Sequence, residues 1–321
     1  MQEQTVIAGV DVAKAELVVS VDEHSAHAQK IPNESDAIVT WLQSRPPRSI
    51  VAMESSGPYH KLLAQLAHAA GMRVYVLNAR DVHMYAKAIS GRAKTDRLDA
   101  AVIVRYVREN QAHLRTWQPC AGVAERVQEL LNRRSKLMRE QVRTRQCLGS
   151  TSALQEISKP LLLAFKTALK DVDDLVTQLV AQEPELERGA KRLEGITGFG
   201  MQSSVRLAAL FTRIPFENAN AVVAYSGLDP RPNDSGAKHG RRRLSKRGPA
   251  ALRWQLYMAA FAANNSMLFK PYHQELRKKH STTESTVILA RKLLRIAWAV
   301  WKSGKEFDPT KYMVESACEK P

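Results

Sequence analysis

Short apolar runs alternate with helical patterns through the first 120 residues. Strands are predicted over 5–10 and 15–21, which are rich in Val and Ile, and over 26–31. A fourth strand ends at Glu54, and a fifth covers 73–77. Apolar residues at helical spacing predict helices over 33–44, 59–70 and 80–89, and another that starts at Asp96. This order of elements is that of an RNase H-like α/β sheet, in which the ends of the first and fourth strands lie side by side.

After Pro119 the pattern is helical. It predicts a helix over 123–147, a break over 149–160 and a second apolar stripe from Leu161 to Leu179. Such a pair zips into an antiparallel coiled coil, packs as a core pair or joins another subunit. Basic residues crowd the outer face of the first helix: Arg133, Arg134, Lys136, Arg139, Arg143 and Arg145. Further helices are predicted over 217–226, 249–265 and 284–302. We therefore expect an α/β domain over 1–120, a coiled-coil hairpin over 121–190 and a mainly α-helical domain over 191–321.

Four acidic residues stand at the ends of these predicted elements. Asp11 and Glu54 end the first and fourth strands, whereas Asp96 and Asp99 begin a helix three residues apart and so point to one side of it. Carboxylates from separate elements can hold two Mg²⁺ ions about 3.5–4 Å apart, which clamps both oxygens of a phosphoryl transfer. The alternative is ordinary polar strand ends and an acid favoured by the helix dipole.

The charge balance favours a polyanionic partner. The chain has 321 residues, with 48 Lys and Arg against 32 Asp and Glu, and a net charge of +16. Such an excess attracts nucleic acid through neutralisation of phosphates and release of counterions. The hydrophobic content of 44% is that of a folded globular protein rather than of a disordered chain.

Positive charge is densest between two predicted helices of the last third. Basic side chains there can bind phosphate oxygens, although many basic runs are merely solvated. The candidates are Lys238, Arg241, Arg242, Arg243, Lys246 and Arg247. Upstream, Gly198 and Gly200 flank Phe199 in a turn where backbone N–H groups could approach phosphate, or which simply joins two helices. Lys94, just before the Asp96 helix, either contacts phosphate or is solvated.

Two serines near this basic segment are candidate nucleophiles. Ser235 lies in an Asp-Ser-Gly turn, and Ser245 is an equally visible local candidate. A serine needs activation before it can attack phosphate, from a metal site or a neighbouring base. Arginines nearby would stabilise the charge that develops on the phosphorus. The alternative for Ser235 is an ordinary turn residue.

Cysteines and apolar stretches indicate a cytoplasmic protein. Cys120, Cys147 and Cys318 are far apart and form neither a zinc spacing nor a disulfide framework. Free thiols of this kind are typical of a reducing cytosol. The first residues do not resemble a signal peptide, and no stretch reaches the ~18 apolar residues of a membrane span. We expect no membrane partner.

Taken together, these segments resemble transposases of insertion-sequence family one-ten (one hundred and ten), which are related to the Piv-type DNA invertases. The resemblance runs from about residue 5 to 310, and its matching stretches are 9–14, 54–57, 94–100, 196–200, 225–230, 234–236 and 244–248. Thr197 departs from the pattern, because the family often has proline before the glycine. The set is specific although each piece alone is not.

The resemblance implies a fold, a site and partners. It implies an RNase H/RuvC-like domain whose DEDD acids are Asp11, Glu54, Asp96 and Asp99, a coiled-coil segment, and a C-terminal domain with Ser235 as nucleophile. It further implies Mg²⁺ as cofactor, double-stranded donor and target DNA, and a structured non-coding guide RNA that bridges them. The assembly would be a dimer or tetramer, with acids and serine joined across subunits.

Our hypothesis from sequence is therefore a Mg²⁺-dependent, RNA-guided transposase or site-specific recombinase that works through a phosphoserine link. The alternative is a RuvC-type structure-selective endonuclease that uses metal-activated water. A third class is a nucleic-acid-binding protein with an inactive metal site.

Overall fold

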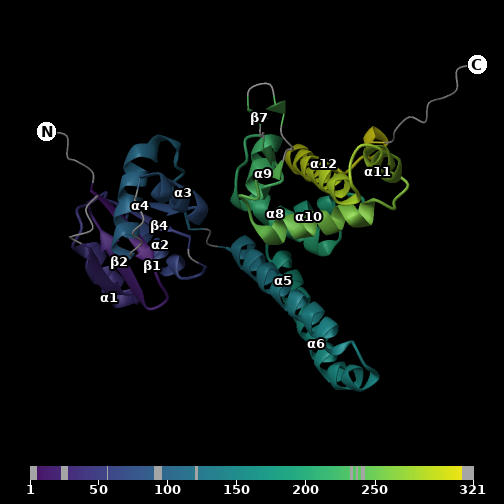
Figure 1. Cartoon of the computed structure of the whole chain (residues 1–321), viewed down its shortest axis with the longest axis horizontal. Helices are drawn as coiled ribbons and strands as arrows, with labels where there is room; N and C mark the ends of the chain where they lie inside the picture. Colours follow the sequence, from purple (N-terminus) through teal and green to yellow (C-terminus); the bar gives the residue numbers. More distant parts are fainter. Residues whose placement is uncertain are drawn as a thin grey trace, which may run out of the picture. The chain divides into compact units, whose positions relative to one another are not determined.

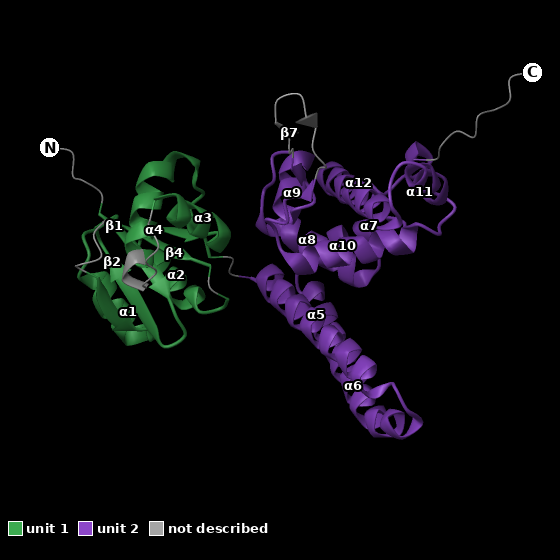
Figure 2. Cartoon of the chain, viewed as in Figure 1, with its two compact units in different colours: residues 1–119 green, residues 120–321 purple. Residues whose placement is uncertain are grey.

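The computed structural model describes two compact units, residues 1–119 and 120–321 (Figure 2). The structure describes residues 6–22, 28–55, 57–89, 96–119, 122–231, 234–235, 238–239 and 243–312. Within these ranges, only the backbone is described for 96–98, 234–235 and 238–239. Lys94, Arg241 and Arg242 lie outside the described residues. No helix among the described residues is long and apolar enough to cross a membrane.

A five-stranded mixed sheet forms the centre of the first unit. Its strands are β1 (Ile7–Val12), β2 (Glu16–Ser20), β3 (Gln29–Pro32), β4 (Ile50–Glu54) and β5 (Arg73–Leu77). They lie in the order β3-β2-β1-β4-β5. β1 pairs with β2 antiparallel and with β4 parallel, and β4 pairs with β5 parallel. The mixed α/β sheet is confirmed, and its order is compatible with the expected RNase H-like fold.

Helices cover both faces of this sheet (Figure 1). They are α1 (Ser35–Gln43), α2 (His60–Ala69), α3 (Ala79–Ile89) and α4 (Asp96–Asn110), followed by a 3₁₀ turn over Gln111–His113. One apolar cluster joins α1 and α2 to alternate strand residues, and a second joins α3 and α4 to the remaining ones. Strands β1 and β4 are therefore buried on both sides, which explains their continuous apolar runs.

The second unit is mainly helical, as predicted. Its helices are α5 (Val123–Leu148), α6 (Ser152–Ala181), α7 (Pro184–Glu194), α8 (Met201–Arg213), α9 (Ala219–Ser226), α10 (Ala250–Ala263), α11 (Lys270–Arg277) and α12 (Thr282–Ser303), with a 3₁₀ turn over Pro309–Tyr312. One apolar cluster contains buried residues of most of these helices. α5 and α6 lie side by side as a hairpin that projects from this cluster (Figure 1).

The predicted break over 149–160 is confirmed only over residues 149–151, and its extension to Pro160 is wrong. Helix α6 starts at Ser152, with the Thr151 side chain accepting a hydrogen bond from the Leu154 N–H at 3.4 Å, and Pro160 lies inside the helix. An interior proline removes one backbone hydrogen bond and normally ends a helix. Packing of α6 against α5 over most of its length outweighs this local cost, as tertiary contacts often do.

Short strand pairs replace part of the loop expected between α9 and α10. β6 (Pro230–Arg231) pairs antiparallel with β9 (Arg243–Leu244), and β7 (Asp234–Ser235) with β8 (Lys238–His239). The segment is thus a β-hairpin whose two described ladders are nested, with β6 and β9 next to the helices. We call residues 230–244 the serine hairpin.

Candidate active site

Two of the predicted acids lie at neighbouring strand ends. In the parallel ladder between β1 and β4, Val10 lies opposite Met53. The next residues are Asp11 and Glu54, so both carboxylates occur at the same level of the sheet. Side chains alternate between faces along a strand, and this parity directs both acids to the face that α4 covers. Both are half-buried.

Glycine at position 9 sets how closely α4 crosses this face. A Cβ atom at Gly9 would lie 2.3 Å from the Ala100 carbonyl oxygen and 2.9 Å from Cγ2 of Val104. No real side chain tolerates such contacts, so the helix rests directly on the β1 backbone. Asp99 precedes this contact on the helix, and Asp11 follows it by two residues on the strand. The start of α4, which carries the half-buried Asp99, therefore lies against β1.

The fourth acid, Asp96, begins α4, but its side chain lies outside the described residues. Among the side chains that are described, no three Asp, Glu, His or Cys residues form a cluster that could hold a metal ion. The donor chemistry of Asp11, Glu54 and Asp99 is that of hard carboxylate oxygens, which suits Mg²⁺ rather than a thiophilic metal.

The two candidate serines differ in their surroundings. Ser235 lies in β7 of the serine hairpin, opposite Lys238 of β8. Ser245 is only 2% exposed, and its hydroxyl donates a hydrogen bond to Oδ1 of Asp229. Its backbone N–H also donates to the Asp229 carbonyl oxygen at 2.9 Å. Ser245 therefore holds the base of the hairpin together, and a phosphodiester has no access to it.

Two glycines allow backbone segments to pack closely at the base of the serine hairpin. Gly227 has a φ of +70°, and a Cβ there would lie 2.8 Å from the backbone nitrogens of Arg247 and Gly248. A Cβ at Gly248 would lie 1.8 Å from the Tyr225 carbonyl oxygen. The segments 225–229 and 245–248, far apart in sequence, thus interlock at backbone contact. Their similarity to family motifs has a structural reason, which sequence reasoning missed.

Arg253 of α10 completes this base. Its Nη1 donates to the Ser226 carbonyl oxygen at 3.2 Å and to the carbonyl oxygen of Gly248. Burial lowers the pKa of this guanidinium. The side chains of Arg243, Lys246 and Arg247, in contrast, are exposed. These three remain the described candidates for contact with a nucleic-acid backbone.

The glycines of the turn before α8 have different environments. Gly198 has a φ of +95°, and a Cβ there would lie 2.5 Å from the Ala259 carbonyl oxygen and 2.7 Å from Cβ of Ala263. Its absence of a side chain is therefore explained by packing against α10. Gly200 is the N-cap of α8, and a Cβ there would meet open space. Phosphate contact by either glycine remains a prediction.

A buried arginine outside the predicted set joins three helices. Arg206 of α8 is 2% exposed and donates to Oδ1 of Asn132 at 2.6 Å, to the Leu131 carbonyl oxygen at 2.8 Å and to Oε1 of Gln255. Burial, and then the positive charge of Arg134, lower the pKa of Arg206 to about 10, which leaves it protonated at neutral pH. In the sequence, the buried role of Arg206 is indicated by its place as a charged residue within an apolar helical stripe.

Arg134 also departs from its expected place on the outer face of α5. It faces α6 instead, where its Nε and Nη2 donate to the two carboxylate oxygens of Asp173 at 2.6 and 2.8 Å. Gln202 of α8 contacts the same carboxylate at 3.4 Å. This ion pair lies in the seam of the hairpin and links it to α8.

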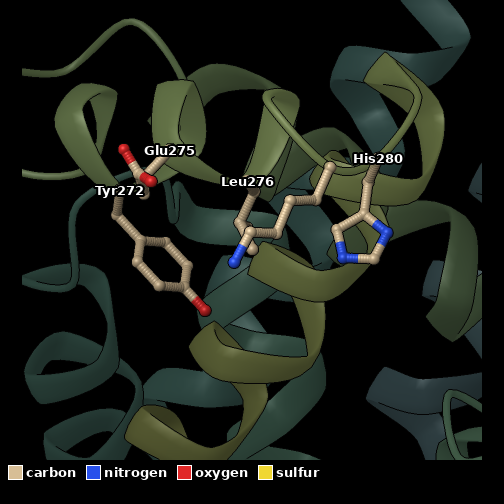
Figure 3. Close-up of a pocket in the computed structure, with 5 residues that line it drawn as sticks. Tyr272, Glu275, Leu276 and His280 are labelled. Atoms are coloured by element: carbon tan, nitrogen blue, oxygen red, sulfur yellow. The ribbon is translucent and has the colours of Figure 1, made fainter.

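A small hollow occurs on α11, apart from all predicted site residues. Tyr272, Glu275, Leu276, Lys279 and His280 line it (Figure 3). Nζ of Lys292 lies 3.7 Å from the centroid of the Tyr272 ring, and burial lowers the pKa of that lysine. The hollow is narrow and open to solvent, and it contains none of the acids or serines considered above.

An α/β unit with acids at adjacent strand ends, followed by a mainly helical unit, is compatible with a DEDD-type transposase. Comparisons with known proteins agree. Residues 8–158 match the DEDD transposase family of IS110 elements, and residues 190–276 match the transposase IS116/IS110/IS902 family. The chain belongs to the IS110 family of transposases and is a DNA-recombining enzyme.

Individual relatives cover most of the chain. The pilin gene-inverting proteins of Moraxella bovis and Moraxella lacunata are 28% and 27% identical, over 80% of this chain and 81% of theirs. The transposase for insertion sequence element IS1328 of Yersinia enterocolitica is 26% identical, over 94% of this chain and 98% of its own.

Proposed function

We propose that the chain is a Mg²⁺-dependent, RNA-guided, site-specific DNA recombinase that exchanges strands through a covalent phosphoserine. The observation that carries the proposal is that Asp11 and Glu54 lie at one level of the sheet, on the face that α4 covers. Inverting and transposing relatives support recombination rather than simple cutting.

The four acids would supply oxygen ligands for the metal. Asp11 and Glu54 lie near the ends of the neighbouring strands β1 and β4, and Asp96 and Asp99 lie in the first turn of α4. Two Mg²⁺ ions held there would neutralise charge on the scissile phosphate. The protein's own part would be to hold these carboxylates on rigid elements, two on strands of the sheet and two on α4.

Ser235 would act as the nucleophile. Its oxygen would form a bond to phosphorus while the bond from phosphorus to one sugar oxygen breaks, and that oxygen would leave with a proton. The serine–phosphate bond conserves the energy of the phosphodiester. A sugar hydroxyl from the partner strand would then attack phosphorus and release the serine. Arg243 and its basic neighbours would offset the negative charge.

The partners follow from the same proposal. Donor and target DNA would be double-stranded, and a structured non-coding RNA would select them by base pairing. A net charge of +16 supports binding of such polyanions. Two or four copies of the chain would assemble, so that acids and serine meet across subunits.

Substitution of the serine tests this chemistry. Ser235→Ala should fold and bind DNA as the parent chain does, but form no protein–DNA adduct after denaturing electrophoresis and exchange no strands. Ser245→Ala serves as the matched control, because its hydroxyl is occupied at the hairpin base. Normal adduct formation by Ser235→Ala would remove that residue from the mechanism.

Substitution of an acid tests the metal. Asp11→Asn keeps the shape of the side chain but removes a charged ligand, so Mg²⁺-dependent adduct formation should fall at least about a hundredfold. Unchanged turnover would contradict the metal assignment. A chain that cuts with Mg²⁺ yet leaves only free DNA ends would instead be the RuvC-type endonuclease.

A further inference from the structure

Helix α12 carries positive charge that no acid on the helix balances. Residues 285–305, which form most of the helix and the turn after it, contain five Lys and Arg and no Asp or Glu. The acid at the start of the helix, Glu284, belongs to the capping box with Ser281. A carboxylate three or four residues away normally stabilises a cation on a helix surface. The cations of α12 have no such neighbour.

Three of these cations form one stripe along the helix. Arg291, Arg295 and Lys302 follow the spacing i, i+4 and i+11, which keeps them on a single face. Arg295 and Lys302 are exposed, and Arg291 is half-buried. We call these three residues the α12 basic stripe. Lys292 is not part of it, because its ammonium group lies over the Tyr272 ring of α11.

Exposed lysines on other helices of the second unit differ from this stripe. They pair with carboxylates on their own helix, as Lys159 does with Glu156, Lys170 with Asp174 and Lys191 with Glu187. Within the part of the chain that the structure describes, no carboxylate forms an ion pair with the stripe. Its positive charge is therefore available to an anionic partner.

The stripe lies beside the helix that leads into the serine hairpin. Nη2 of Arg295 donates to Oδ1 of Asn220 in α9 at 2.5 Å, and α12 packs against α9 (Figure 1). Asn220 precedes Ser226 by six residues, which is roughly 9 Å along a helix. Ser226 contacts Arg253 at the base of the serine hairpin. A nucleic-acid backbone bound at this hairpin would therefore have only a short way to the stripe.

We propose that the α12 basic stripe binds the phosphate backbone of double-stranded DNA that flanks the site of exchange. The inference deepens the proposed function, on which it rests only for DNA as the substrate. It assigns a second DNA-binding surface, outside the serine hairpin and the four acids. Arg and Lys side chains neutralise phosphates and release counterions, which gives affinity without reading the base sequence.

The length of the stripe and the absence of an exposed ring within it favour a duplex. Arg291 and Lys302 are eleven residues apart, which is roughly 16 Å along the helix. One strand of B-DNA advances about 3.4 Å per phosphate, so about five phosphates span the same length. Trp298 lies on the same face but is half-buried against the core. Unpaired bases, which stack on exposed aromatic rings, therefore have no platform on this stripe.

Fluorescence anisotropy of a labelled DNA duplex with the full chain, over a series of salt concentrations, tests the stripe. Each lost phosphate contact should lower the slope of log affinity against log salt concentration by about 0.9. Arg291→Gln, Arg295→Gln and Lys302→Gln together should therefore lower this slope by about 2–3. Duplex affinity at about 0.15 M salt should fall at least about tenfold.

The matched control removes the same number of charges from other helices. Lys159→Gln, Lys170→Gln and Lys191→Gln together lower the net charge equally, but these lysines already pair with carboxylates. This control should keep the parent slope. Charge-conserving Arg291→Lys with Arg295→Lys should also bind as the parent chain does, because a phosphate contact of this kind needs the charge. Circular dichroism checks that all variants fold.

Three outcomes would overturn the inference. One is a parent chain that does not bind the duplex, and another is an equal loss of slope in the stripe and control variants, which would reflect net charge alone. The third is a loss confined to an RNA hairpin or to single-stranded DNA measured in parallel, which would assign the stripe to that ligand. Failure of the proposed function looks different, because Ser235→Ala should keep the parent slope whatever its activity.

Discussion

At the scale of single residues, chemistry that looks alike in the sequence has different surroundings. Ser235 and Ser245 both stand in polar, glycine-containing segments beside arginines. Ser245 is buried, and its hydroxyl is closed off against Asp229. Sequence spacing could not show this, since the partner of Ser245 lies 16 residues away and meets it only when the hairpin base closes.

The contacts of Ser245 and the proposed role of Ser235 as nucleophile predict different phenotypes for two alanine substitutions. Ser245→Ala leaves the Asp229 carboxylate without its hydroxyl donor and should lower the free energy of unfolding by about 1–2 kcal/mol. Ser235→Ala should leave the free energy of unfolding unchanged. Urea titration followed by circular dichroism measures both. Equal stability of the two variants would contradict the described role of Ser245.

His273 of α11 provides a pH-dependent prediction. The residue is 8% exposed, and no hydrogen-bond partner of its Nε2 is found among the described residues. Burial, and then the charge of Arg277, lower the pKa of His273. The folded chain therefore resists protonation of this ring, whereas the unfolded chain takes up the proton near pH 6.5.

The contribution of neutral His273 to the free energy of unfolding is fully present above the pKa of the unfolded chain. It is lost as the pH falls below about 6.5. Urea midpoints of the parent chain should thus decline between pH 7.5 and 5.5 more than those of His273→Gln. The same decline in both chains would show that other groups are responsible.

At the scale of elements, local pattern predicted most helices and strands, and packing decided the exceptions. The strands ending near Asp11 and Glu54 are where their apolar runs placed them. Pro160 misled the prediction for α6, because contacts with α5 outweigh a missing backbone hydrogen bond. The short strands of the serine hairpin carried no pattern long enough to detect.

The crossing of α4 over β1 yields a test at this scale. Gly9→Val would force the helix away from the strand, because even a Cβ would lie 2.3 Å from the Ala100 carbonyl oxygen. We expect a loss of about 1–3 kcal/mol in stability, together with weaker strand exchange because α4, which carries Asp99, would shift relative to β1. Gly200→Ala is the control for stability, because its Cβ would meet open space. Parent-like stability of Gly9→Val would refute the close crossing.

At the scale of the whole molecule, polar contacts join the helical hairpin to the rest of its unit. Arg134 of α5 pairs with Asp173 of α6, and Arg206 of α8 reaches α5 and α10. These groups are largely removed from water, so their orientation is set by several simultaneous hydrogen bonds. Side-chain contacts therefore fix the α5–α6 hairpin to the rest of the second unit, in addition to the chain connection.

Arg206→Leu should loosen the attachment of the α5–α6 hairpin to α8 and α10. The substitution leaves the Leu131 carbonyl oxygen and the side chains of Asn132 and Gln255 without their donor, and we expect a loss of about 3 kcal/mol. Arg206→Lys should recover only part of it, because an ammonium group cannot reproduce the planar fork of donors. Differential scanning calorimetry of the full chain measures both, and an unchanged Tm for the Leu variant would contradict this role.

The sequence by itself determined what depends on near neighbours: the alternation of strands and helices, the two acids at strand ends, the excess of positive charge and the family. Only the tertiary structure decided which groups meet. It interlocked the two glycine segments at the base of the serine hairpin, buried Ser245 and placed Arg134 in the seam between α5 and α6. The physical reason is that burial and hydrogen bonding arise between residues remote in the chain, whereas periodicity records only the local backbone.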